Sequence, residues 1–281
     1  MDLDYKKIRQ LDLRIRDICE DIDSTKYPET KKNLCEYIEM VDEYDGDQLN
    51  DMRMLMVSLY EADSAKVFEK RIGKLLIDFY KYDAQLGEPM SMNNLGSVYQ
   101  NGRLGKRYYE EAIKYYQMSD KNGCRIASEN LGYTYYYGLG TEIDYEKAYY
   151  YFSKAAMAGR YIAMYKIGDM FRYGLYVEKD LNATRDSYLR AAKLIKDKQE
   201  TPLVEYGSLY TRLGDMYYEG LGVDVDIDKA YTFYQNAQKE LYTQTLKGDP
   251  WHQKMLEHVA DRLSNINRKI KKTLPEFEWS N

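Results

Sequence analysis

The sequence predicts an all-α solenoid built from repeated pairs of helices. Three observations predict it. A Leu-Gly or Ile-Gly pair recurs at spacings of 36, 36 and 46 residues, beginning at Leu95, Leu131, Ile167 and Leu213. An aromatic residue follows each of these glycines after three positions, and a second glycine follows after three more. In the later part of each copy, an aromatic residue and several small residues also occur at equivalent positions. One unit is therefore repeated along the chain.

The first element expected is a helix from Asp4 to Asp23. Its apolar residues step by three and four and therefore form one stripe. They are Ile8, Leu11, Ile15, Ile18 and Ile22. We interpret the stripe as the inner face of a helix that caps the array, and the alternative is a short coiled-coil seam that joins two copies of the chain.

The next helices are expected to begin at Pro28, Leu49 and Val67 and to end near residues 44–47, at Glu61 and at Ala84. Gly87 and Phe79 lie 36 residues before Gly123 and Tyr115, which is the spacing of the first clear repeats. The segment from residue 64 therefore reads as a degenerate repeat, as is usual at the end of a solenoid.

Within each clear repeat, the Leu-Gly half is expected to form helix A and the second glycine to end it. Helix B is expected to begin at an aspartate, Asp144, Asp180 or Asp226, whose carboxylate can accept backbone N–H bonds there. The first repeat has Tyr108 at this position. Because glycine inside a helix costs about 1 kcal/mol relative to alanine, we expect the first glycine to allow close packing of helix A on helix B.

The chain is expected to end in a capping helix. Ten extra residues precede Leu213, and the charged segment 196–202 among them is expected to lengthen a helix B and its loop. The last helix is expected to begin at Pro250, with apolar residues Leu256, Val259, Leu263, Ile266 and Ile270 on one face, and the tail Leu274 to Asn281 to fray. The predicted division is an N-terminal helical cap over 1–63, a repeat array over 64–245, and a C-terminal capping helix and tail over 246–281.

Composition narrows the class of protein. The chain has 281 residues and a formal net charge of −5, which disfavours a general phosphate binder, so we expect no nucleic-acid partner. Neither a secretory signal nor a membrane span is recognisable. The three cysteines, Cys19, Cys35 and Cys124, are widely spaced, which argues against a disulfide framework. We expect a cytoplasmic protein, and secretion without a signal is the alternative.

No catalytic, cofactor or metal site is expected. His252 and His258 are six residues apart, so they lie on different faces of a helix, unlike the pair of a helical zinc site. The alternating aspartates of residues 222–228 lack the glycine and glutamate of a calcium loop. The cysteines and histidines lie in unrelated parts of the array, so no nucleophile and base can be paired. The chain is therefore predicted not to be an enzyme.

The repeated residues, best preserved in Leu131 to Gly159 and Leu213 to Ala237, resemble the Sel1-like repeat family, a relative of the tetratricopeptide repeats. The resemblance covers residues 93–238 strongly and 64–92 weakly. It implies antiparallel helix pairs stacked into a right-handed superhelix, and a non-catalytic adaptor that gathers other proteins.

Tyrosine is unusually frequent, with 32 tyrosines against 6 phenylalanines. Tyrosines between core positions either seal the margins between helices or form a partner surface. If helix A lines the concave side, three of its positions form ladders across the repeats: the residue before each Leu-Gly or Ile-Gly pair, the residue after it, and the sixth residue after its leucine or isoleucine. The candidate binding residues are Asn94, Ser97, Asn101, Asn130, Tyr133, Tyr137, Lys166, Asp169, Tyr173, Arg212, Asp215 and Glu219.

These ladders predict a site for a protein or an extended peptide, with two asparagines for its backbone and two cations for an acidic group. The leading functional hypothesis is a scaffold that exists as a monomer or as a weak homodimer through the N-terminal helix. The alternatives are an enzyme or enzyme subunit, such as a hydrolase acting on cell-wall fragments, and a self-associating structural protein.

Overall fold

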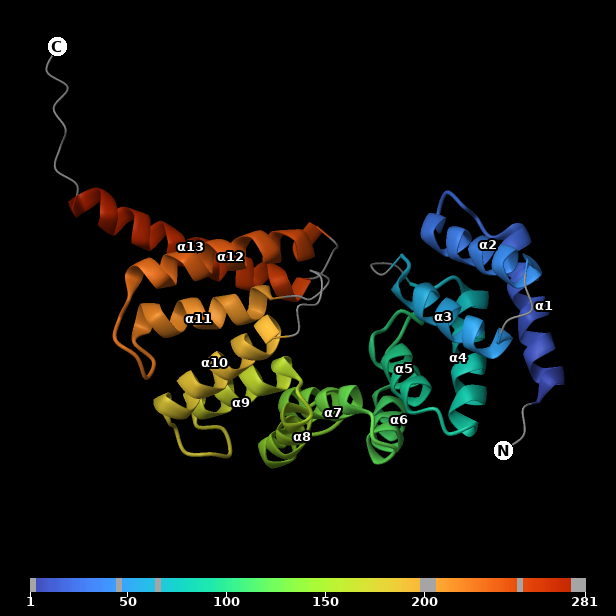
Figure 1. The fold of residues 1–281 in the computed structure, drawn as a ribbon, viewed down its shortest axis with the longest axis horizontal. Coiled ribbons are helices and arrows are strands. Elements are labelled where there is room, and N and C mark those ends of the chain that lie inside the picture. Colours follow the sequence, from blue (N-terminus) through green and yellow to red (C-terminus); the bar gives the residue numbers. More distant parts are fainter. Residues whose placement is uncertain (1–3, 44–46, 64–66, 198–205, 247–249, 274–281) are drawn as a thin grey trace, which may run out of the picture. The chain divides into compact units, whose positions relative to one another are not determined.

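The computed structural model describes residues 4–43, 47–63, 67–197, 206–246 and 250–273. All regular secondary structure in these residues is helical, which confirms the predicted all-α class (Figure 1). The chain divides into two compact units, Met1–Ile143 and Asp144–Asn281. Each unit is described below on its own.

Unit 1 holds the helices α1 (Tyr5–Asp21), α2 (Pro28–Glu43), α3 (Gln48–Glu61), α4 (Lys70–Gln85), α5 (Pro89–Gln100), α6 (Tyr109–Lys121) and α7 (Arg125–Tyr137). The helices pack mainly on their neighbours in sequence, α2 on α3, α4 on α5, α5 on α6 and α6 on α7. Helix α1 packs on both α2 and α4. Gly87 and Gly123 follow α4 and α6 with φ angles of +94° and +88°, as the predicted register of the degenerate repeat requires.

The N-terminal stripe is buried inside unit 1. Its five isoleucine and leucine residues, Ile8, Leu11, Ile15, Ile18 and Ile22, all belong to the core. Helix α1 therefore packs with its stripe inward, as the interpretation of this segment as a capping helix requires. The stripe is not exposed for a coiled-coil seam, so a dimer through it would require α1 to leave α2 and α4.

Unit 2 holds the helices α8 (Tyr145–Met157), α9 (Tyr161–Tyr173), α10 (Leu181–Asp197), α11 (Gly207–Glu219), α12 (Ile227–Leu246) and α13 (Pro250–Thr273). The closest packing joins α9 to α10 and α11 to α12, which are helices A and B of the third and fourth repeats. Helix α13 covers α12 and buries Val259, Leu263 and Ile266. The side chain of Ile270 and the tail from Leu274 lie outside the described residues.

In three of the four repeats, the first glycine lies against an aromatic ring of helix B. A Cβ atom added at Gly96, Gly168 or Gly214 would stand 2.6 Å from ring atoms of Tyr116, Tyr188 or Tyr234. This distance is too short for any real contact, so the absence of a side chain allows the two helices to approach. The steric role expected for this glycine is confirmed in these three repeats.

The ends of the helices also follow the sequence pattern. Helices α7, α9 and α11 end at Gly138, Gly174 and Gly220, which adopt the left-handed conformation with φ of 66°, 66° and 72°. The carboxylates of Asp144 and Asp226 accept the backbone N–H three residues on, at 2.9 Å in both cases. Asp180 caps α10 in the same way, and Tyr108 makes no side-chain cap.

The ten-residue insertion falls where helix α10 is longer than the two B helices before it. This helix has 17 residues, whereas α6 and α8 have 13 each. Most of the charged segment 196–202 lies outside the described residues, as do residues 44–46, near which α2 was expected to end. The division of the chain at residues 63 and 245 stays a prediction.

Candidate functional site

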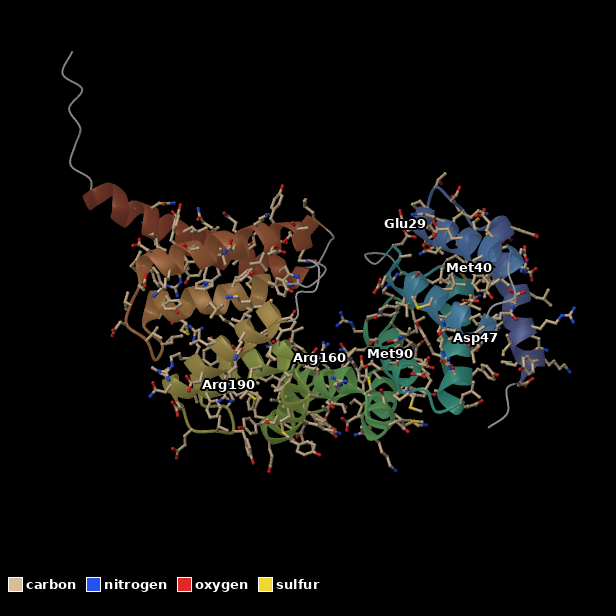
Figure 2. The ribbon with its side chains drawn as sticks, viewed as in Figure 1. Glu29, Met40, Asp47, Met90, Arg160 and Arg190 are labelled. Carbon is tan, nitrogen blue, oxygen red and sulfur yellow. The ribbon has the colours of Figure 1, made fainter. Side chains whose placement is uncertain are left out.

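The twelve predicted site residues lie on the A helices α5, α7, α9 and α11 or at their ends. Figure 2 shows the described side chains around these helices. Six of them, from Asn94 to Tyr137, belong to unit 1, and the six from Lys166 to Glu219 belong to unit 2. The two groups differ in chemistry, because the first is uncharged and the second carries five charged side chains.

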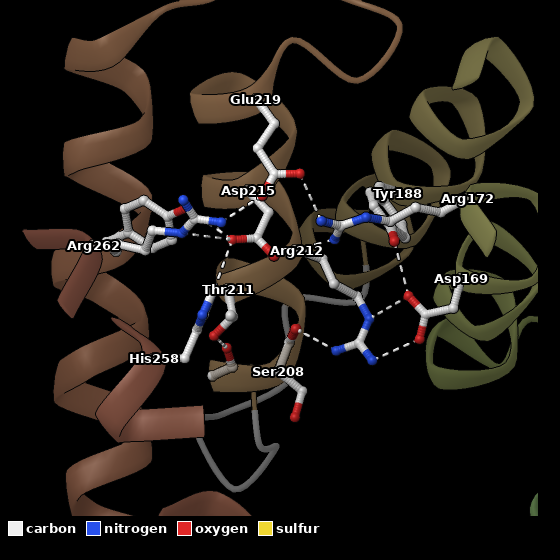
Figure 3. Close-up of polar contacts among 12 residues, drawn as sticks. Asp169, Arg172, Tyr188, Ser208, Thr211, Arg212, Asp215, Glu219, His258 and Arg262 are labelled. Carbon is white, nitrogen blue, oxygen red and sulfur yellow. Dashed lines mark hydrogen bonds and ion pairs between the residues drawn. The ribbon is translucent and has the colours of Figure 1, made fainter. Parts of the chain in front are cut away.

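In unit 2, Asp169 and Arg212 form an ion pair between two successive A helices (Figure 3). The Nε and Nη2 atoms of Arg212 donate to the two carboxylate oxygens of Asp169 at 2.7 and 2.6 Å. Lys166 approaches the same carboxylate at 3.7 Å. Because Lys166, Asp169 and Arg212 all have side chains that are at most 14% exposed, these charges satisfy one another inside the unit.

A second cluster lies one repeat further on and is centred on Asp215 (Figure 3). Its carboxylate contacts Arg172 of α9 at 3.1 Å and His258 of α13 at 2.9 Å. Glu219 accepts hydrogen bonds from Arg172 and Arg262 at 2.8 and 2.5 Å. The cluster therefore joins α9, α11 and α13 through their charged side chains.

Helix B contributes a tyrosine hydroxyl to each of these aspartates. Tyr188 donates to Asp169, and Tyr234 donates to Asp215, both at 2.8 Å. Burial raises the pKa of both tyrosines, and the facing carboxylates raise it further, so the hydroxyls stay protonated and remain donors. In unit 1, Ser97 takes the place of the aspartate and lies 3.1 Å from the hydroxyl of Tyr116.

The pKa values of the two aspartates reflect these contacts. Burial alone would raise the pKa of Asp169, but the charge and hydrogen bonds of Arg212, helped by Lys166, hold it below its usual range. Burial also opposes ionisation of Asp215, and His258, Tyr234 and Arg172 lower its pKa. Both carboxylates are therefore ionised, and each pairs with basic side chains of neighbouring helices.

In unit 1, the predicted site residues form an uncharged polar surface. The amide of Asn130 donates to the oxygen of Asn93 at 2.9 Å, and Asn93 donates to Asn94 at 3.3 Å. Asn101 donates to the hydroxyl of Tyr60 at 3.0 Å. The sequence indicated Asn94, Asn101 and Asn130, whereas Asn93 and Tyr60 joined the group only in the structure.

Tyrosines of α7 extend this surface. Tyr133 and Tyr137 stack with ring centroids 6.0 Å apart and planes 8° from parallel, and Tyr136 meets Tyr137 edge-on at 4.8 Å. Tyr137 is 40% exposed. In unit 2, Tyr173 at the end of α9 is 59% exposed and lies beneath the guanidinium of Arg172. Tyr137 and Tyr173, which fall between the core positions of their repeats, thus reach the surface.

The Sel1 repeat family matches four segments of the chain, residues 89–123, 126–159, 162–194 and 209–237. These segments are the four copies identified by their Leu-Gly pairs. The chain belongs to the Sel1 repeat family.

Two solved structures are similar in fold to this Sel1 repeat protein. A Sel1 repeat protein from Oxalobacter formigenes has a TM-score of 0.53 and 24% identity, over 68% of this chain and 73% of that one. The second is c5321, a protective antigen present in uropathogenic Escherichia coli strains, with a TM-score of 0.51 and 22% identity. That match covers 84% of this chain and 54% of c5321, so this chain spans about half its length. No curated protein matches the sequence.

The two histidines of the Sel1 repeat protein lie in different surroundings. His258 contacts Asp215, and His252 is buried on α13, so the two histidines are not adjacent ligands. Within the described ranges, no group of three or more His, Cys, Asp or Glu side chains could hold a metal ion. No helix of these ranges is long and apolar enough to cross a bilayer.

The sequence reasoning missed the ion pairs, although their spacing is regular. Arg172 to Asp215, Asp169 to Arg212, Asp215 to His258 and Glu219 to Arg262 are each 43 residues apart. For the two pairs between α9 and α11, this is the 46-residue spacing of the third and fourth repeats minus about one helical turn. The other two pairs join α11 to the last helix, α13. A search for opposite charges at this offset identifies the ladder.

Proposed function

We propose that this Sel1 repeat protein is a non-catalytic scaffold that binds a protein through an extended segment. Sel1 repeats typically serve as protein-interaction scaffolds, which supports the general class. The more specific proposal places the binding surface on the A helices of unit 1.

The observation that carries this proposal is the stacked tyrosine pair Tyr133 and Tyr137 on the same helix as Asn130. Tyrosine offers a large, stiff contact area with a hydrogen-bonding tip at a low entropic cost. An asparagine amide carries both donors and an acceptor, so it can pair with a peptide backbone. Asn94 and Asn130 are both partly exposed beside the buried Asn93.

The expected ligand is a neutral extended segment with an aromatic or apolar anchor. The sequence-based proposal also assigned Lys166 and Arg212 to an acidic group on the ligand. Both cations are buried against Asp169, and an acidic ligand would have to displace that carboxylate. We therefore leave these two cations, with Asp169 and Asp215, out of the proposed surface.

The test uses peptides selected on the full chain from a random display library. The variant Asn94→Ala/Asn130→Ala/Tyr137→Ala removes two amides and one exposed ring from the A helices. The matched control Tyr150→Ala/Tyr242→Ala removes two exposed tyrosines from helices α8 and α12. We expect the selected peptides to bind the first variant about tenfold more weakly or worse, because anchor residues carry most binding energy.

Circular dichroism checks that both variants keep their helices, and fluorescence anisotropy measures the affinities. The proposal fails if the A-helix variant binds the peptides as tightly as the wild-type chain, or if the control loses as much affinity. It also fails if selection returns no binding peptide.

A further inference from the structure

Two of the three cysteines meet in the N-terminal cap, outside the Sel1 repeats. Cys19 of α1 and Cys35 of α2 have their Sγ atoms 3.0 Å apart, and both are free thiols. Their spacing of 16 residues did not predict this contact. The two helices pack directly on each other, so the contact joins two neighbouring helices of unit 1.

The sulfur atoms need to move little to form a bond. A disulfide has an S–S length of about 2.05 Å, so the two atoms need to approach by about 1 Å more. Cys19 is 6% exposed and lies among the isoleucines of the stripe, whereas Cys35 is half-buried. A small oxidant therefore reaches Cys35 before Cys19.

We propose that Cys19 and Cys35 are a site of oxidation, at which a peroxide joins α1 to α2 through an intrachain disulfide. The Cys35 thiolate attacks one peroxide oxygen, the O–O bond breaks, and a sulfenic acid forms with release of hydroxide. The Cys19 sulfur then attacks the sulfenic sulfur, the S–O bond breaks, and the departing oxygen leaves as water with the Cys19 proton. In total, two thiols and one hydrogen peroxide give one disulfide and two waters.

The surroundings of the pair assign the two roles. Burial, together with a smaller effect of Cys35, raises the pKa of Cys19 to about 11, so Cys19 remains a protonated thiol at neutral pH. A buried, protonated thiol is a poor first nucleophile. It is well placed to resolve a sulfenic acid 3.0 Å away, because the reacting atoms are already in contact.

The bond would fix α1 on α2. Helix α1 already holds α4 through Arg14 and Asp78, whose side chains meet at 2.9 Å. Closing the loop between α1 and α2 restricts the unfolded chain and so favours the folded cap. Oxidation is therefore expected to slow the opening of α1 from α2.

The experiment oxidises the reduced full-length chain with a small excess of hydrogen peroxide. After the peroxide is removed, the chain is denatured and its thiols are alkylated, so that buried cysteines are also counted. We expect one alkylated cysteine instead of three. The intact chain, weighed before alkylation, should be lighter by about 2 Da because two hydrogens are lost. Peptide mapping should find two peptides joined through Cys19 and Cys35. The remaining thiol should be Cys124, the N-cap residue of α7.

Two variants serve as controls. Cys124→Ser should form the same disulfide, and Cys35→Ser should keep Cys19 available for alkylation. The proposal is overturned if all three thiols of the oxidised wild-type chain are alkylated, if the bond involves Cys124, or if it joins two chains. Peptide mapping of the wild-type chain decides between these outcomes even if a variant does not fold.

Discussion

In three of the repeats, the residue after the Leu-Gly or Ile-Gly pair connects helix A to helix B, and in unit 2 it also contacts a neighbouring A helix. Asp169 accepts a hydrogen bond from Tyr188 within its own repeat and pairs with Arg212 of the next one. Ser97 keeps only the first of these contacts, with Tyr116. At the scale of single residues, the paired charges of unit 2 therefore help to hold its helices together.

Replacing Arg212 by Met should destabilise unit 2 by about 3 kcal/mol at neutral pH, because it leaves the Asp169 carboxylate buried with a weaker partner. Lys166 remains near the carboxylate at 3.7 Å and limits the loss. The measurement is urea unfolding. The exposed Arg190 of α10 provides the control, and Arg190→Met should change stability by less than about 0.5 kcal/mol (Figure 2).

The same comparison has a pH dependence whose sign is fixed by Asp169. Its pKa is lowered in the folded state, so its contribution to stability is present above the unfolded value, about 4, and is lost as pH falls through the folded value. The difference between wild type and Arg212→Met should therefore shrink between pH 4 and pH 2. An equally large difference at pH 2 would show that Arg212 acts through packing on Tyr165, whose ring its guanidinium covers at 4.3 Å.

Single residues also mark the limit of prediction from the sequence. Gly168, Asp180 and Gly174 were assigned correctly because their roles depend on neighbours within one helical hairpin. The pairing of Arg212 with Asp169 depends on how successive repeats are stacked, so inspection of one repeat did not reveal it. Cys19 and Cys35 belong to no repeat, so no register related them.

At the scale of helices, the glycine of helix A sets the distance between the two helices of a repeat. Gly214 faces the buried ring of Tyr234, whose hydroxyl is held by Asp215. Both its burial against helix A and its hydrogen bond to Asp215 therefore hold the ring in place. The helix boundaries could be predicted from the sequence because caps and glycine stops depend on residues that are close in sequence.

Replacing Gly214 by Ala should destabilise unit 2 by about 2 kcal/mol, because the added Cβ overlaps the ring of Tyr234. Without the overlap, alanine would stabilise the helix by about 1 kcal/mol. The control is the same change in a Tyr234→Leu background, where the substitution should be neutral or stabilising. Thermal unfolding of the four proteins measures this coupling, and equal losses in both backgrounds would contradict the steric explanation.

At the scale of the whole molecule, the two units carry different kinds of polar contact. The A helices of unit 1 use amides and hydroxyls, such as Asn130 to Asn93, whereas those of unit 2 use ion pairs, such as Asp169 to Arg212. The predicted binding ladder treated all repeats alike, because the repeat pattern gives positions and not burial. Partner binding and stacking are therefore proposed to rest on different repeats.

In a solenoid, each repeat contacts only its neighbours, so damage to one interface should stay local. The Arg212→Met change removes a contact between α9 and α11. We expect amide hydrogen exchange to become faster in α9, α10 and α11 and to stay unchanged in α4, α5 and α6. Exchange measured by mass spectrometry on the wild-type and variant chains gives the comparison, with Arg190→Met as the control. Faster exchange in all helices would instead mean that the whole chain opens as one cooperative body.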